Sequence, residues 1–286
     1  MKVLFVGGGN MCQAILGGLI VQGVPMAGMR AIEPQADTRA ALLAMGIAAA
    51  TDCRDSDLDV DTIVLAVKPQ MMQVAVAPLA GKLRSQLVIS IAAGIRSRDL
   101  AGWLVGDPRT ANAKPYENIV RAMPNTPALI RAGITGLYAA KAVGNAARAA
   151  TEALLGTVGQ TAWFDDEVML DAVTAVSGSG PAYVFYFIEA LEAAARELGF
   201  DEPTARQFAL QTFLGGAKLA AASADAPATL RARVTSKRGT TERAIETFDA
   251  LDVRKHIIAG VKAACERSRE LGDEMGRRTT DGIGKS

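Results

Sequence analysis

Short apolar runs rich in β-branched residues alternate with helix-like stretches along the first half of the chain. The apolar runs predict strands at residues 2–7, 29–33, 62–67, 86–93, 118–123, 133–139 and 160–164. The stretches between them predict helices at 11–22, 37–45, 94–104 and 145–158. Strands that alternate with helices are typical of a parallel sheet covered on both faces. The first half is therefore predicted to be an α/β domain.

The pattern changes after Asp165, where strand-like runs stop and helical periodicity takes over. Apolar residues from Val184 to Leu198 recur at helical spacing, which predicts one long amphipathic helix. Acid and proline at 201–203 and at 225–227 predict the starts of two more. So small a helical domain is expected to bury part of its apolar surface against a partner chain. We expect an α/β domain at 1–164, a helical domain at 165–273 and a flexible tail at 274–286.

Composition narrows the possible functions. Half of the 286 residues are apolar and 21% are charged, as in a soluble globular protein. The net charge of +1 gives no general attraction to nucleic acid or to an anionic membrane. The three cysteines lie far apart, which favours free thiols and a cytoplasmic location over disulfides or a zinc site. His256 is the only histidine, so neither a Ser-His-Asp triad nor a two-histidine metal site is expected.

A glycine-rich turn, VGGGNMC, follows the first predicted strand and opens the first predicted helix. Gly7 and Gly9 allow a sharp turn and a close approach to a pyrophosphate, which a helix N-terminus attracts. Cys12 stands at the third position of the usual dinucleotide fingerprint, so a plain tight turn is the alternative. Glu33 ends the second strand, where an acid can accept hydrogen bonds from the adenosine ribose. Its alternative is a solvated loop acid.

Further candidate stretches lie where later strands end. AVKP (66–69) and SIAAG (90–94) end the third and fourth strands, at the edge where ligands of open α/β sheets bind. RAMPNTP (121–127) predicts a rigid turn suited to placing groups beside a nicotinamide ring. Each is alternatively a strand terminator or a simple turn. SGSGPAYVF (177–185) indicates the close approach of another backbone or simple packing, and residues 105–117 indicate a surface loop.

The stretch VTSKRGTTERAIETF places Gly239, Thr240 and Thr241 at the start of a predicted helix. Unpaired amide N–H groups, two hydroxyl groups and the helix dipole suit this start to a small carboxylate. Ordinary N-capping by one threonine is the alternative. If the bound acid were a protonated imine, its own positive charge would draw in a hydride, and no strong catalytic acid would be needed.

The chain closely resembles the pyrroline-5-carboxylate reductases, the last enzymes of proline biosynthesis, from about Val3 to Leu271. The resemblance is carried by six blocks in order: GGGNM, AVKPQ, SIAAG, IVRAMPNTPALI, AVSGSGPAYVF and VTSKRGTTERAI. It implies an α/β fold with an N-terminal Rossmann-like parallel-sheet domain and a C-terminal all-α dimerisation domain. It also implies a homodimer, dimers assembled into rings, and hydride transfer from NADPH or NADH to L-1-pyrroline-5-carboxylate, giving L-proline.

The resemblance further implies roles for individual residues. The cofactor residues would be Gly7, Gly9, Asn10 and Met11 around the pyrophosphate, Ala66, Val67, Lys68, Pro69, Ala92 and Ala93 along the cofactor, and Asn125 near the nicotinamide. Ser236, Gly239 and Thr240 would hold the substrate carboxylate. Thr241 would offer its hydroxyl to the ring nitrogen. In such families the helical domain of one chain usually completes the site beside a cofactor held by a Rossmann domain.

Three departures from the family pattern bear on function. Lys237 and Arg238 replace a common Pro-Gly pair and add two positive charges beside Gly239. Glu33 replaces a small or polar residue, which suggests tolerance of or preference for NADH, because an acid there would repel a 2′-phosphate. Residues 105–117 form an insertion to which the sequence assigns no role.

Two rival interpretations remain. The β-hydroxyacid dehydrogenases share the layout, but they are expected to carry a lysine on the helix after their glycine-rich substrate motif. Residues 177–199 contain none. A non-catalytic dinucleotide sensor would bind NAD(P)H without turnover, and the intact GTT block argues against it.

Overall fold

The computed structural model describes residues 1–106 and 114–281. Its chain divides into two compact units, the first made of Met1–Gly178 with Ala264–Ser286 and the second of Ser179–Ala263. The predicted boundary at residue 165 separates a sheet domain from a dimerisation domain. It stays a prediction, because contacts within one chain do not show which residues contact a second copy. Residues 274–281, expected in a flexible tail, continue the last helix. Residues 107–113 of the expected loop lie outside the described residues.

One eight-stranded sheet forms the centre of the first unit, in the order β3-β2-β1-β4-β5-β6-β7-β8. Its strands are β1 (Val3–Val6), β2 (Met29–Ile32), β3 (Ala48–Ala50), β4 (Thr62–Leu65), β5 (Leu87–Ser90), β6 (Ile119–Met123), β7 (Gly133–Ala139) and β8 (Gly159–Phe164). Every neighbouring pair is parallel except β6 and β7. The predicted parallel-sheet domain is therefore confirmed, with β6 and β7 as the one antiparallel pair among the described strands. Only residues 124–132 join β6 to β7, too few for the crossover that parallel pairing needs.

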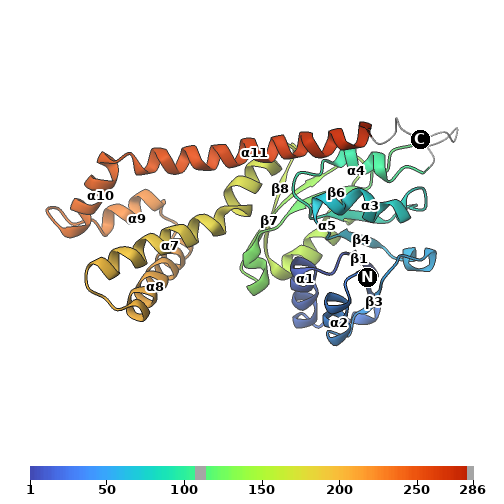
Figure 1. Ribbon diagram of the computed structural model, residues 1–286, viewed down its shortest axis with the longest axis horizontal. Helices are drawn as coiled ribbons and strands as arrows, with labels where there is room; N and C mark the ends of the chain where they lie inside the picture. Colours follow the sequence, from blue (N-terminus) through green and yellow to red (C-terminus); the bar gives the residue numbers. More distant parts are fainter. Residues whose placement is uncertain (107–113, 282–286) are drawn as a thin grey trace. The chain divides into compact units, whose positions relative to one another are not determined.

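Helices cover both faces of this sheet (Figure 1). One face carries α1 (Asn10–Val21), α2 (Ala36–Ala44) and α5 (Asn145–Leu155), and the other carries α3 (Met72–Val76) and α4 (Ser97–Trp103). Successive strand residues point to opposite faces, so Phe5 packs in the first core and Leu4 in the second. Short 3-10 helices lie at Met26–Gly28, Asp55–Leu58, Pro69–Met71, Ala77–Leu79, Thr126–Ile130 and Gly156–Val158.

The SGSG segment lies where the first unit ends. Helix α6 (Met169–Val173) continues into a π-helical turn, Thr174–Gly178. A Cβ at Gly178 would lie 2.6 Å from the Cε atom of Met123. This contact is to a side chain at the end of β6, which agrees with simple packing, one of the two alternatives for this segment.

The second unit is entirely helical in its regular structure. It contains α7 (Gly180–Glu197), α8 (Glu202–Ala221), α9 (Pro227–Arg233), α10 (Thr240–Ala250) and the first part of α11 (Val253–Asp281). The predicted helix starts are confirmed, since Asp201 caps α8 by accepting the N–H of Thr204 over 3.0 Å and Pro227 opens α9. Helices α7 and α8 lie side by side (Figure 1). In α7 to α10 only Ala205 and Ala209 are buried, which leaves large apolar side chains exposed.

Candidate active site

The order of the strands reverses at β1, which pairs with β2 on one side and with β4 on the other. Ligands of open α/β sheets bind at such a switch point, outside the carboxyl ends of the strands. Gly7 follows β1 with φ +97°, a conformation that favours glycine. A Cβ there would lie 2.7 Å from the carbonyl oxygen of Ala66, which follows β4. The glycine turn and the AVKP stretch therefore meet at the switch point.

Helix α1 opens beside this turn with an accessible N-terminus. Its N-cap, Gly9, has no side chain to occupy the first amides, and residues 10–13 include no acid. Gly9 and Asn10 are exposed, and a Cβ built on Gly9 would meet no atom of the described residues within 4 Å. Open amides at a helix start bind phosphate groups. The geometry therefore fits the pyrophosphate of a dinucleotide.

Cys12, at the third position of the fingerprint, is fully buried against the sheet. Burial, followed by the charge of Glu33, raises the pKa of the Cys12 thiol. The residue is therefore a neutral packing group that takes the place of the usual glycine.

Glu33 is only 7% exposed, so it is not a solvated loop acid. Its Oε2 accepts the N–H of Gly8 over 2.8 Å, and its Oε1 accepts the N–H of Gln35 over 2.8 Å. Gln13 holds the same turn from α1, donating from Nε2 to the carbonyl oxygen of Gly8 over 2.9 Å. Sequence analysis missed both bonds to Gly8, because the partners lie 5 and 25 residues away.

Arg39 brings a positive charge to the end of β2. Its Nη1 donates to the carbonyl oxygens of Glu33 over 2.8 Å and Pro34 over 3.0 Å. The sequence analysis did not single out this residue. The guanidinium group of Arg39 and the carboxylate of Glu33 thus lie where the adenosine ribose of a dinucleotide binds in this class of sheet.

The remaining predicted cofactor residues follow the carboxyl ends of β4, β5 and β6. After β4, Lys68 is exposed and makes no ion pair with any described residue. After β5, Ala92 is buried and Ala93 half-buried. After β6, Asn125 accepts the N–H of Ile134 at Oδ1 over 2.9 Å, which leaves its amide nitrogen available as a donor. The structure thus brings all the predicted cofactor residues to one edge of the sheet.

The predicted substrate residues lie in the second unit, at the start of α10. The helix begins at Thr240 with Gly239 as its N-cap, and no side-chain cap bond forms there. The alternative that a threonine side chain simply caps this helix is therefore wrong. A Cβ at Gly239 would lie within overlap distance of Ser236 Oγ, so the Ser236 hydroxyl stands directly beside the helix start. Hydroxyl groups and open amides together suit a carboxylate.

Arg238 precedes this start in a left-handed conformation, with φ +60°. Its backbone N–H donates to Oε2 of Glu242 over 2.5 Å. Lys237 and Arg238 are both exposed, and their charges offset the carboxylate of Glu242 in the first turn of α10. Sequence analysis identified the two cations but missed Glu242.

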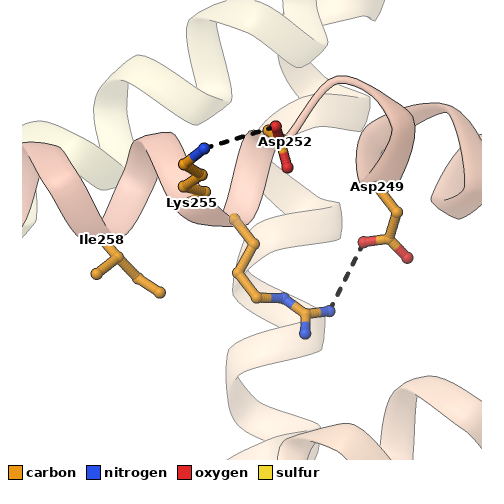
Figure 2. A pocket seen from close by; sticks show the side chains of 5 residues that line it. Asp249, Asp252, Lys255 and Ile258 are labelled. Carbon is orange, nitrogen blue, oxygen red and sulfur yellow. Dashed lines mark ion pairs between the residues drawn. The ribbon is translucent and has the colours of Figure 1, made fainter.

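A separate hollow in the second unit lies at the junction of α10 and α11 (Figure 2). Two ion pairs cross its wall, Lys255 with Asp252 over 3.9 Å and Arg254 with Asp249 over 3.8 Å. All four side chains are mostly exposed, so the hollow is a solvated surface junction. Within residues 1–106 and 114–281, no cluster of three metal-binding side chains occurs, and no helix is long and apolar enough to cross a membrane.

Comparison with family models matches both parts of the chain. Residues 167–271 match the model for pyrroline-5-carboxylate reductase dimerisation. Residues 2–94 match the model for NADP oxidoreductases, coenzyme F420-dependent.

Individual relatives extend over nearly the whole length. The pyrroline-5-carboxylate reductase of Pseudomonas aeruginosa is 44% identical over 96% of this chain and 98% of its own. That of Haemophilus influenzae is 40% identical over 94% and 97%. Among solved structures, a pyrroline-5-carboxylate reductase from Coxiella burnetii is 36% identical with a TM-score of 0.85, over 94% of this chain and 98% of that one. The Plasmodium falciparum enzyme with NADP bound is 26% identical with a TM-score of 0.77, over 95% and 98%.

Proposed function

Because the chain belongs to the pyrroline-5-carboxylate reductase family, we propose that it reduces L-1-pyrroline-5-carboxylate to L-proline with NADPH or NADH, the last step of proline biosynthesis. One observation carries the proposal: the relatives match both the sheet unit and the helical unit, nearly end to end. The net reaction adds a hydride to the imine carbon of the ring and a proton to its nitrogen.

The cofactor is held by the edge of the sheet in this proposal. NAD(P)H, when bound, supplies the hydride. Gly7, Gly9, Asn10 and Met11 receive the pyrophosphate, which is supported by the open start of α1 and by the space beside Gly9. Ala66 to Pro69, Ala92, Ala93 and Asn125 line the rest of the cofactor, which is supported by their common position after β4, β5 and β6.

The substrate carboxylate is held by the start of α10. Thr240 offers its backbone amide, and Ser236 offers a hydroxyl group beside it. The N–H of Gly239 donates to the carbonyl oxygen of Ser236 over 3.0 Å, so Gly239 contributes through its close packing against Ser236 and its place as N-cap. The helix dipole adds to the attraction for a negative charge. Lys237 and Arg238 raise the local positive potential in the loop before the helix. These contacts fix the ring, and positioning of this kind supplies a large share of rate enhancement.

Thr241 acts at the ring nitrogen. Its hydroxyl group lies in the first turn of α10, next to the proposed carboxylate anchor, and it donates a hydrogen bond to the nitrogen as the C=N bond is reduced. The imine is itself an electrophile once protonated. A site of hydroxyl groups and amides therefore suffices without a histidine or a metal.

The protein acts as a homodimer through its helical residues. The family model for dimerisation supports oligomer formation. The proposed surface consists of exposed apolar side chains of the second unit: Val184, Phe185, Tyr186, Leu191, Phe208, Leu210, Leu214, Leu219, Val234, Phe248, Leu251, Ile257 and Ile258. Exposed apolar surface on this scale marks an interaction site. We extend the proposal to rings of dimers and to a cytoplasmic location, the latter supported by three free cysteines.

The test is a turnover assay with purified protein. Oxidation of NADPH and of NADH is followed at increasing concentrations of pyrroline-5-carboxylate, and L-proline is quantified. One proline per cofactor oxidised is the expected result. Cofactor binding without turnover would favour the sensor, and turnover of β-hydroxyacids alone would favour the rival dehydrogenase group.

A further inference from the structure

One carboxylate in the sheet unit joins three groups from two other segments. Glu167 lies between β8 and α6. Its Oε1 accepts the backbone N–H of Ser97 over 2.6 Å and Nη1 of Arg121 over 2.9 Å, and its Oε2 accepts Ser97 Oγ over 2.8 Å. The side chain of Arg121 is 9% exposed and that of Glu167 is 22% exposed. This is a shielded ion pair, with both carboxylate oxygens in use.

The contact to Ser97 fixes the end of the loop 91–96. Ser97 is the first residue of α4, and the N-cap residue Arg96 does not cap the helix with its side chain. Glu167 supplies that cap from 70 residues away. Arg96 is instead bound to Asp273 of α11 over 2.5 Å. The last residues of the loop are thus held from two sides.

The start of the same loop is held by the sheet. The N–H of Ile91 donates to the carbonyl oxygen of Leu65 in β4 over 3.1 Å, and Ala92 and Ile95 are buried in the core beneath α3 and α4. Ala92 and Ala93 therefore sit on a loop with both ends fixed. Without Glu167, the cap of α4 would be lost while the start of the loop stayed in place.

The contact to Arg121 links this loop to the neighbouring strand. Arg121 lies in the middle of β6, opposite Ser90 of β5, and β6 leads directly into the turn that carries Asn125. A buried arginine that loses its carboxylate partner is strongly destabilised. The carboxylate of Glu167 therefore fixes the position of the loop after β5 and of the strand that precedes Asn125.

We propose that Glu167 is a positioning residue of the reductase, which holds the loop 91–96 against β6 and so fixes the two segments that carry the proposed cofactor residues Ala92, Ala93 and Asn125. The inference rests on the proposed function, because it takes Ala92, Ala93 and Asn125 as cofactor contacts. Glu167 itself touches neither cofactor nor substrate in this account.

The test compares Glu167→Ala, Glu167→Gln and Ser97→Ala with the wild type. Glu270→Gln is the matched control, because Glu270 also pairs with an arginine, Arg267 over 2.7 Å, but on the exposed side of α11. For each protein, the KM values for NAD(P)H and for pyrroline-5-carboxylate, kcat, and the melting temperature are measured. The Kd of NAD(P)H without substrate is measured by fluorescence.

Glu167→Ala is expected to raise the KM for NAD(P)H about 10-fold and to lower kcat about 10-fold, while the KM for the imine changes less than about twofold. Glu167→Gln is expected to be milder, since the amide oxygen still accepts the N–H of Ser97. Ser97→Ala is expected to raise the KM for NAD(P)H about threefold, and Glu270→Gln to match the wild type.

Folded Glu167 variants with a lower melting temperature but unchanged KM for NAD(P)H and unchanged kcat would overturn the proposal, because they would show a structural role alone. If neither Glu167 variant folds, an unchanged KM in Ser97→Ala overturns it. A wild type inactive on the imine would refute the proposed function instead. In that case the Kd values of the variants still decide the positioning role.

Discussion

Gly8 and Glu33 are joined by a buried hydrogen bond of 2.8 Å, from the backbone N–H of the glycine to Oε2 of the carboxylate. The bond fixes the glycine turn after β1 to the end of β2. Because Gln35 occupies the other oxygen, the carboxylate is held in one orientation. The negative charge of Glu33 therefore remains at the place where the cofactor ribose is expected, with Arg39 beside it.

This arrangement predicts the cofactor preference. We expect the wild type to accept NADH at least as well as NADPH, because Glu33 repels a 2′-phosphate. Glu33→Gln is expected to shift the ratio of kcat/KM about 10-fold towards NADPH. It is also expected to destabilise the fold by about 1–3 kcal/mol, since one buried amide loses its acceptor. Asp37→Asn, an exposed change on α2, is the control, and a strong NADPH preference in the wild type would refute the prediction.

The glycine turn offers a matched pair of substitutions. Gly9→Ala is expected to leave the melting temperature unchanged, because its Cβ enters open space at φ −65°. It should nevertheless weaken NAD(P)H binding about 10-fold or more, since the pyrophosphate needs that space. Gly7→Ala should destabilise the fold itself by about 2 kcal/mol, owing to its positive φ and the close carbonyl of Ala66. Unchanged cofactor affinity in Gly9→Ala would place the pyrophosphate elsewhere.

Thr241→Ala tests the group assigned to the ring nitrogen. We expect kcat to fall about 100-fold, as for loss of one positioned hydrogen-bond donor to the reacting centre, with the Kd of NAD(P)H within about twofold of the wild type. Thr247→Ala is the control on the same helix, because that hydroxyl is exposed and donates to the carbonyl oxygen of Arg243 one turn earlier. Equal loss of turnover and of cofactor affinity would argue against the role of Thr241.

Arg238→Gly tests the strained residue before α10. A non-glycine residue at φ +60° costs about 1 kcal/mol, so glycine is expected to raise the free energy of unfolding by about that amount. The KM for the imine should rise, because one positive charge beside the carboxylate anchor is lost. Arg238→Lys keeps both the charge and the strain. A higher KM in that variant as well would mean that charge is not the cause.

The sequence predicted most of the fold because its strands are short runs of large apolar residues between clear helix boundaries. The strand Ala48–Ala50 was missed, since three alanines carry no β-branched signal. The antiparallel direction of β7 was not predicted either. Strand direction depends on the length of the connection and not on the residues of the strand itself.

The site was predicted unevenly for a similar reason. Local sequence alone was enough to identify Gly7, Gly9 and Gly239, because each lies just before a predicted helix start. The roles of Glu33 and Glu167 depend on partners 25 and 70 residues away, and no spacing rule reveals those. Arg121 offered one usable signal, since a charge inside an apolar strand needs a buried partner.

A crystal structure with L-proline and the oxidised cofactor bound would test the central claim, that the start of α10 grips the carboxylate while the sheet edge holds the nicotinamide. We expect the proline carboxylate within hydrogen-bond distance of the backbone amides of Thr240 and Thr241 and of Ser236 Oγ, with the ring nitrogen facing Thr241 Oγ1. Proline bound away from residues 236–241, with that helix start left to solvent, would contradict it.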